Sequence, residues 1–149
     1  MPVDVSDLVF SPATGADIDL LAAMNAGLAR DEMSSIAGEP REFFVKRMTG
    51  FLAGEYDGIV FRDGATAVGY ALYRRHEGYL HVRQYFIAED YRRQGLGRAC
   101  FERLRREVFP ADMPVGLEVL LTNPNGEAFW RAVGFEPLYT AMRMPPLRA

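Results

Sequence analysis

The sequence contains few of the residues that would tie it to an oxidising compartment or to a membrane. Cys100 is the only cysteine, so no disulfide can form within the chain and the fold does not depend on oxidation. No stretch approaches the ~18 consecutive apolar residues of a membrane-spanning helix, and the first residues lack the charged-then-apolar layout of a signal peptide. We therefore expect a cytoplasmic protein without a membrane partner.

Histidine and excess positive charge are also scarce. The only two histidines, His76 and His81, have no matching cysteine or carboxylate pattern near them, so we expect no metal site. The formal net charge is −3, which argues against a domain built mainly to bind nucleic acid.

What the sequence does contain fits one globular domain spanning residues 1–149. Apolar residues make up 49% of the chain and charged residues 25%, ordinary values for such a domain. A chain of this length buries about 70% of the surface that its unfolded form exposes, so its core can be stable without disulfides or bound metal ions. Cys100 falls at helical spacing with Leu96, Leu104 and Val108, which indicates a buried apolar residue rather than a nucleophile.

The first half of the chain changes from helical to strand spacing. Thr14 or Asp17 is expected to cap the first helix, and Asp63-Gly64 has the chemistry of a hairpin turn. The expected helices are Ile18 to about Met33 and Arg41–Leu52; the expected strands are Asp7–Pro12, Tyr56–Arg62, Ala67–Arg75 and Tyr79–Ile87.

The second half alternates helices and strands. Val115–Leu121 is nearly all apolar, as in a strand buried inside a sheet, and Gly134 is placed to end the last helix. The expected order is a helix over Leu96–Phe109, a strand over Val115–Leu121, a helix over Asn125–Val133 and a final strand over Pro137–Met144.

A glycine-containing turn precedes the helix that begins at Leu96. In Arg92-Arg93-Gln94-Gly95-Leu96-Gly97, two glycines allow an anion to approach the main chain and allow φ to become positive. Amide groups at a helix N-terminus point outward without partners, and the helix dipole adds partial positive charge there. The turn is therefore expected to bind a diphosphate.

The same residues resemble a known family. Arg92, Gly95 and Gly97 match the [Q/R]-x-x-G-x-[G/A] signature of the GNAT acyltransferase superfamily, and the resemblance extends roughly from Leu8 to Met144. It implies an α/β (α+β) GNAT fold, a central mixed, mostly antiparallel six-stranded sheet flanked by about four helices, in the order β-α-α-β-β-β-α-β-α-β. The family usually ends with two strands after the last helix, and here there is room only for a shortened hairpin.

The resemblance also implies acetyl-CoA as co-substrate. In the family, the strand before the turn pairs through its backbone with the pantetheine arm, and Tyr85 and Ile87 match it by position; an unpaired strand edge suits an amide-rich arm. An amide near Tyr85 would lie where the thioester carbonyl becomes an oxyanion, which is worth on the order of 10²–10³ in rate. The residues expected to contact the cofactor are Tyr85, Phe86, Ile87, Arg92, Arg93, Gln94, Gly95, Leu96, Gly97, Arg98, Asn123 and Trp130.

Two other phosphate-binding motifs are excluded. The string Gly95-x-Gly97-x-x-Cys100 lacks the third glycine of a dinucleotide fingerprint, and its strand belongs to a meander rather than to a βαβ unit. No P-loop string is present.

The catalytic side chains are less clearly indicated. An amine must be deprotonated to attack a thioester, and His81 is the leading candidate base. It lies at even spacing from Tyr85 and Ile87, hence nominally on one face of the strand, although a β-bulge would change that parity. A structural role for His81 stays open, and Glu118, Asp31 and Glu32 are weaker candidates. Tyr85 completes the expected catalytic pair through its amide.

The segment from Asn123 to Phe135 matches the family's N-x-x-[A/G]-x-x-F-Y-x-x-x-G-F pattern, with Trp130 at the tyrosine position. Many family members use that tyrosine to reprotonate the departing thiolate, but an indole N–H cannot act as a general acid. Either the thiolate leaves unassisted, or another group such as Tyr139 helps. Trp130 is then expected to pack against the cofactor arm or the core, and Asn123 to contact the cofactor.

Together these features predict an N-acetyltransferase that transfers an acetyl group directly to a primary amine of a small molecule or peptide. Asp31, Glu32 and Glu39, expected near the acceptor cleft, would suit a cationic amine. The alternative is a non-catalytic acetyl-CoA-binding regulatory module. The sequence does not determine the oligomeric state, and a homodimer is one possibility.

Overall fold

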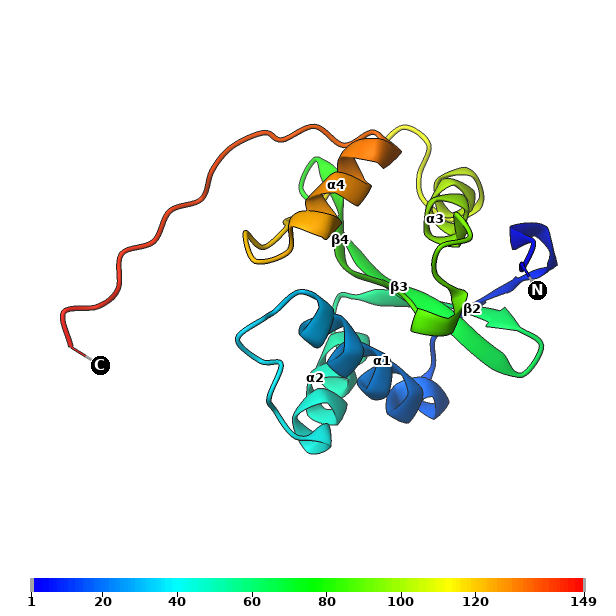
Figure 1. The fold of residues 1–149 in the computed structure, drawn as a ribbon, viewed down its shortest axis with the longest axis horizontal. Coiled ribbons are helices and arrows are strands. Elements are labelled where there is room, and N and C mark those ends of the chain that lie inside the picture. The colour runs from blue at the N-terminus through cyan, green and yellow to red at the C-terminus, as the bar shows by residue number, and fades with distance from the viewer. Residues whose placement is uncertain (1, 149) are drawn as a thin grey trace.

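The protein is built around one sheet with helices on both faces. The structure, a computed structural model, describes residues 2–148. Its helices are α1 (Ile18–Asp31), α2 (Arg41–Ala53), α3 (Leu96–Glu107) and α4 (Pro124–Val133), and its strands are β1 (Val9–Pro12), β2 (Asp57–Asp63), β3 (Thr66–His76), β4 (Tyr79–Ile87) and β5 (Val115–Gly116). Figure 1 shows α1 and α2 on one side of the sheet and α3 and α4 on the other. No helix within residues 2–148 is long and apolar enough to cross a membrane.

The chain enters its first helix through a capping box. The Thr14 hydroxyl accepts a hydrogen bond from the Ala16 N–H at 3.3 Å, and the Asp17 carboxylate accepts one from the Thr14 N–H at 2.9 Å. These bonds satisfy amides at the start of a short 3₁₀ helix, η2 (Gly15–Asp17), which leads directly into α1. Thr14 and Asp17, the two expected caps, thus form the capping box of η2, whereas α1 itself has no side-chain cap hydrogen bond.

The strands lie in the order β1-β2-β3-β4-β5. β2, β3 and β4 form an antiparallel meander, because short turns at Gly64 (φ +59°) and Gly78 (φ +84°) reverse the chain after β2 and β3. β1, which α1 and α2 separate from β2 in sequence, also pairs antiparallel with β2. β5 follows the crossover helix α3 and pairs in parallel with β4, joining Val115 to Leu80 and Gly116 to His81. The sheet is mixed and mostly antiparallel, as expected.

Each face of the sheet has its own apolar core. Leu21, Met48 and Tyr70 are fully buried between the sheet and the pair α1–α2. On the opposite face of the sheet, Cys100 and Phe101 are buried on the inner side of α3. Burial raises the pKa of the Cys100 thiol to about 12, so this residue is an unreactive part of the core, in agreement with its helical spacing.

A bulge in β4 changes which side chains face each core. The register with β3 shifts so that Leu72 pairs with Gln84 and Tyr73 with Val82, which leaves Arg83 as the extra residue. Val82 and Tyr85 consequently both face the α3 side, although they are an odd number of residues apart. The expectation that His81 shares a face with Tyr85 is wrong for this reason, since His81 is adjacent to Val82 and points toward the other side.

The expected sixth strand is not part of the sheet. Residues 137–144 form no strand, and Figure 1 shows them in an extended tail that leaves the end of α4 and runs away from the body. β5 is also shorter than expected, since only Val115–Gly116 of the stretch 115–121 pairs with β4. A strand requires a hydrogen-bonded neighbour, and within residues 2–148 neither segment has one along its full length.

Candidate active site

The candidate site lies where β4 and β5 separate. The two strands pair only at Leu80 and His81, and beyond that point the edge of β4 has no strand partner within residues 2–148. A cavity of about 610 Å³ occupies the opening. Its walls come from the end of α1, from residues 82–87 of β4, from the turn before α3, from residues 117–118 and from the start of α4.

The turn at one end of this cavity has the geometry expected of an anion site. Gly95 is the N-cap residue of α3 in the left-handed conformation, φ +74°, and no side chain of the described residues caps the helix. Gly95, Leu96, Gly97 and Arg98 all line the cavity. The first amides of α3 therefore face an open cavity with no competing side-chain acceptor.

Gly97 also allows the helices to approach closely. A Cβ atom placed on Gly97 would lie 3.3 Å from the Phe129 ring of α4 and 3.6 Å from Ile87 of β4. The Tyr85 hydroxyl donates to the Gly97 carbonyl oxygen at 2.5 Å. The turn is thus held against β4 and α4 by contacts that leave its amides free.

Most polar side chains of the turn bind the protein itself. Arg92 donates from Nε to the Ile87 carbonyl oxygen at 2.7 Å, and its Nη2 lies 2.6 Å from the Asp31 carboxylate. Gln94 accepts from the Val3 N–H, and Arg98 pairs with Glu102. Arg93 (φ +65°) also lines the cavity and forms no hydrogen bond or ion pair within residues 2–148. Arg93 is therefore the side chain of this turn that is open to an incoming anion.

The Tyr85 side chain belongs to an aromatic cluster. Its ring lies 5.3 Å from that of Trp130, 5.7 Å from that of Phe101 and 6.4 Å from that of Phe129, between ring centroids. Burial raises the pKa of the Tyr85 phenol well above its ordinary value, and its proton is donated to Gly97. The phenol is thus held within the protein by its bond to Gly97 and by the aromatic cluster, and Tyr85 lines the cavity.

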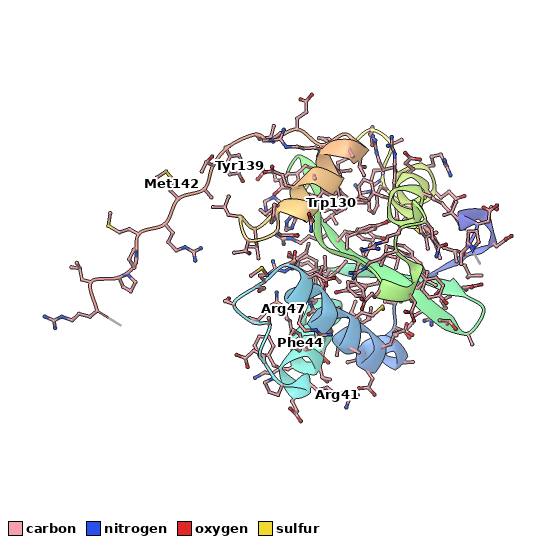
Figure 2. The ribbon with its side chains drawn as sticks, in the orientation of Figure 1. Arg41, Phe44, Arg47, Trp130, Tyr139 and Met142 are labelled. Atoms are coloured by element: carbon pink, nitrogen blue, oxygen red, sulfur yellow. The ribbon has the colours of Figure 1, made fainter. Side chains whose placement is uncertain are left out.

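Trp130 packs in the same cluster, with Phe101 and Phe135 at 5.1 and 5.3 Å, while one part of it lines the cavity. Asn123 is the N-cap residue of α4: its side-chain oxygen accepts from the Gly126 N–H at 3.1 Å, and the residue lines the cavity. Tyr139, 79% exposed, lies on the tail, and Figure 2 shows it apart from Trp130. Within one chain it does not reach the cavity.

His81 and Glu118 form a pair at the other end of the β4–β5 opening. His81 Nε2 lies 2.8 Å from Glu118 Oε2. The His81 ring is nearly buried, whereas the Glu118 side chain is 70% exposed and lines the cavity. The pair joins two residues that the sequence analysis named as separate candidate bases. Of the two, the Glu118 carboxylate lies nearer to the cavity than the His81 imidazole does.

Two carboxylates at the end of α1 line the cavity and differ in their partners. Asp31 is neutralised by Arg92, while Glu32 lines the cavity without an ion-pair partner in the described chain. Burial raises the pKa of Glu32, the charge of Asp31 adds to the rise, and Arg47 opposes it. Glu39, expected near this cleft, lies in the loop after α1 and does not line the cavity.

Two hydrogen bonds around the cavity were not anticipated. The Tyr70 hydroxyl donates to Gln84 Oε1 at 2.7 Å beneath the cavity floor. The Thr122 hydroxyl donates to the Glu32 carbonyl oxygen at 2.7 Å, which ties the segment before α4 to the end of α1. The sequence carries no signal for either bond, because each depends on elements that only the fold brings together.

Comparison with known proteins agrees with this geometry. A sequence model of the acetyltransferase (GNAT) family matches residues 28–135. No curated protein sequence matches the chain significantly. Among solved structures, a possible acetyltransferase from Clostridium difficile 630 superposes with a TM-score of 0.75 at 16% identity, covering 95% of this chain and 99% of the other.

Two aminoglycoside acetyltransferases share the fold as well. AAC(6')-Iy, solved in complex with CoA, gives a TM-score of 0.72 at 11% identity and covers 94% of this chain and 95% of its own. AAC(6')-IG from Acinetobacter haemolyticus gives 0.73 at 12% identity, with 93% and 97% covered. Identities this low show a common fold and nothing finer. With the family match over most of its length, the chain belongs to the acetyltransferase (GNAT) family.

Proposed function

We propose that the protein transfers an acetyl group from acetyl-CoA to a primary amine. The observation that carries this proposal is the opening between β4 and β5, which has uncapped α3 amides at one end and the His81–Glu118 pair at the other. When bound, acetyl-CoA supplies an acetyl thioester: the amine nitrogen bonds to the acetyl carbon as the carbon–sulfur bond breaks, and the proton that the amine loses is matched by one gained by the thiolate.

The residues present fit this co-substrate. The amides of Leu96, Gly97 and Arg98 would hold the diphosphate at the α3 N-terminus, because these groups face the cavity and Gly95 leaves their approach open. Arg93 adds beside them a guanidinium that has no ion-pair partner within residues 2–148. The unpaired edge of β4 over residues 82–87 would hold the amide-rich arm by strand addition.

The backbone near Tyr85 would stabilise the oxyanion. Tyr85 is locked by its hydroxyl bond to Gly97 and by the aromatic cluster, so an amide at this position is fixed before substrate binds. A preorganised donor of this kind is worth on the order of 10²–10³ in rate.

The His81–Glu118 pair would take the proton of the attacking amine. Glu118 reaches the cavity, and His81 lies behind it at hydrogen-bond distance, so that a proton accepted at the carboxylate can be shared with the imidazole. Imidazole is the side chain suited to proton exchange near neutral pH. Glu32, at the α1 end of the cavity, would attract a cationic amine.

No side chain of the described cavity is placed to protonate the departing thiolate, because Trp130 has no ionisable proton and Tyr85 is bound to Gly97. A thiol ordinarily ionises with a pKa of about 8.5, so a thiolate is a tolerable leaving group. This feature keeps the non-catalytic CoA-binding module as the competing function.

A steady-state assay of free-thiol release separates the two functions. The protein is mixed with acetyl-CoA and a panel of small monoamines, polyamines, amino acids and peptides, with acceptor-free reactions as the background. We expect thiol release that depends on at least one cationic amine. Tight CoA binding by calorimetry with no thiol release across the panel would instead identify a binding module.

A further inference from the structure

Two arginines on the α2 side of the sheet have no carboxylate partner. Arg47, on α2 and labelled in Figure 2, and Arg83, on β4, form no ion pair within residues 2–148. Both guanidinium groups lie over the same ring, with their Cζ atoms 5.0 and 4.9 Å from the Phe51 centroid. Burial lowers the pKa of the Arg47 guanidinium, and the charge of Arg83 lowers it further. Two like charges held this close repel each other, and a bound anion would relieve the repulsion.

The neighbouring carboxylates leave one positive charge in excess. Glu32, at the end of α1, is close enough for its charge to act on Arg47, but the two form no ion pair. Arg74, the next arginine on this side of the sheet, is already paired with Glu55. If Glu32 offsets the charge of Arg47, the charge of Arg83 remains without compensation. A single negative charge, such as that of a carboxylate, suits this balance better than a doubly charged phosphate.

The bulge in β4 places Arg83 at the wall of the cavity. Arg83 is the extra residue of the bulge, and its neighbour Gln84 faces the same side, where it accepts a hydrogen bond from the Tyr70 hydroxyl. Arg83 lines the cavity together with Glu32. Its one hydrogen bond within residues 2–148 is long, from Nη1 to the Tyr56 hydroxyl at 3.4 Å. The other N–H donors of the guanidinium can therefore bind a carboxylate in the cavity.

Arg83 lies a short distance along β4 from the proposed reaction centre. It is two residues before Tyr85, near whose backbone the oxyanion would form, and two residues of a strand span about 6–7 Å. A compact molecule that carries both an amine and a carboxylate can therefore reach Arg83 and the thioester at once. Glu32 lines the same cavity and would attract the ammonium group. The cavity wall thus offers a partner for each of the two charges of an amino acid.

We propose that the acceptor is an amino acid whose carboxylate is bound by Arg83 and whose amine is acetylated. This inference rests on the proposed acetyl transfer and names the acceptor class. The amine nitrogen gains the acetyl group as the carbon–sulfur bond breaks and loses one proton, and the carboxylate stays unchanged. Arg47, behind Arg83, adds to the positive potential at the carboxylate. Both arginines determine specificity and take no part in the chemical step.

Each amino acid is compared with its own carboxamide, which has nearly the same size but lacks the negative charge. Glycine, β-alanine, L-leucine, L-phenylalanine and their amides are assayed as acceptors at saturating acetyl-CoA. The readout is the ratio of kcat/KM for the acid to kcat/KM for the amide, so a general change in activity cancels. At least one pair should give a ratio of about ten, the least that one charge-assisted hydrogen bond contributes. Amides used as well as the acids in every pair would overturn the proposal.

Substitution of the two arginines locates the effect. Arg83→Gln should lower the ratio to about one, chiefly by raising KM for the acid, and Arg83→Lys should recover part of it because the charge remains. Arg47→Gln should lower the ratio by a smaller factor. Arg75→Gln, at an exposed position of β3 outside the cavity, is the matched control and should keep the wild-type ratio. A wild-type ratio in Arg83→Gln would contradict the proposal.

Binding measurements separate this inference from the proposed transfer. If no acceptor releases thiol, the proposed function fails, but calorimetry of the CoA-saturated protein with the same pairs still tests the carboxylate site. An acid that binds about tenfold more tightly than its amide would support the site. Equal binding, or no binding, of acid and amide in every pair would overturn it. 2-Aminoethylphosphonate is compared with β-alanine in the same way, and tighter binding of the phosphonate would contradict a site for a carboxylate.

Discussion

The guanidinium of Arg92 lies 2.6 Å from the carboxylate of Asp31, and this contact joins the turn before α3 to the last turn of α1. Arg92 also donates to the Ile87 carbonyl oxygen and lies 5.1 Å from the Phe86 ring centroid. An arginine in the signature of the turn thus connects three walls of the cavity. Its charge is already paired, so its contribution to cofactor binding is expected to come from positioning.

A double-mutant cycle tests this role. Asp31→Asn and Arg92→Gln should each weaken CoA binding by a similar factor, and the double variant should be little worse than either one. Because both side chains are more than one third exposed, the coupling is expected to be only about 0.5 kcal/mol, about twofold in Kd. Isothermal calorimetry with CoA measures it. An effect confined to Arg92→Gln would show that Arg92 meets the diphosphate directly.

The pair of His81 and Glu118 predicts a change in pH dependence. His81→Gln and Glu118→Gln should each lower kcat/KM by about 10², the lower end of what a positioned general base contributes, and should flatten its rise with pH. Steady-state rates across pH 5.5–9 give the profile. His76→Gln is the control, because this exposed histidine stacks on Tyr79 at the start of β4 and does not line the cavity.

An unchanged profile in both variants would remove the pair from catalysis. A purely structural pair would instead lower the melting temperature and leave the shape of the profile as it was, so thermal melts of each variant accompany the kinetics.

The elements that sequence predicted well are those that depend on nearby residues. Tyr79–Ile87 has the observed bounds of β4, since strand spacing and Gly78 are local signals. The turn around Gly95 was likewise predictable, because its positive φ requires glycine. Local patterns do not specify side-chain partners, so the Arg92–Asp31 pair, 61 positions apart in sequence, could not be anticipated.

The predictions of strand length and of which face a strand side chain points to were wrong for a related reason. The apolar run 115–121 has strand chemistry, but only two of its residues find a neighbour in the same chain. The bulge at Arg83 reversed the expected facing of His81, since one inserted residue changes the parity of the strand. Both features depend on how strands meet, which spacing within one strand does not determine.

Glu32 predicts opposite effects on stability and activity. Its folded-state pKa is raised above the ordinary value of 4.5, chiefly by burial. The native state therefore favours the protonated form of Glu32 more than the unfolded state does. The associated stability is present below that value and is lost as pH rises through the folded pKa. Glu32→Gln should therefore raise the melting temperature by about 1–2 °C at pH 7, and the gain should disappear near pH 4.

The same substitution should raise KM for cationic amines, whereas Glu39→Gln, outside the cavity, should change neither property. Differential scanning calorimetry and initial rates at fixed acetyl-CoA give the two readouts. A lower melting temperature for Glu32→Gln at pH 7 would contradict the assignment of Glu32 as a partly buried carboxylate without an ion-pair partner in the described chain.

Two glycines of similar conformation allow backbone strain to be separated from cofactor binding. Gly95 (φ +74°) and Gly64 (φ +59°) both have open space where a Cβ atom would lie. Alanine at either position is expected to cost about 1–2 kcal/mol, because the left-handed region is unfavourable for residues with a Cβ atom. Gly64→Ala, in the β2–β3 hairpin, should lower the melting temperature and leave CoA affinity unchanged. Gly95→Ala should lower the melting temperature and also weaken CoA binding, because it distorts the turn that aims the α3 amides into the cavity. Equal CoA affinity in the two variants would place the diphosphate elsewhere.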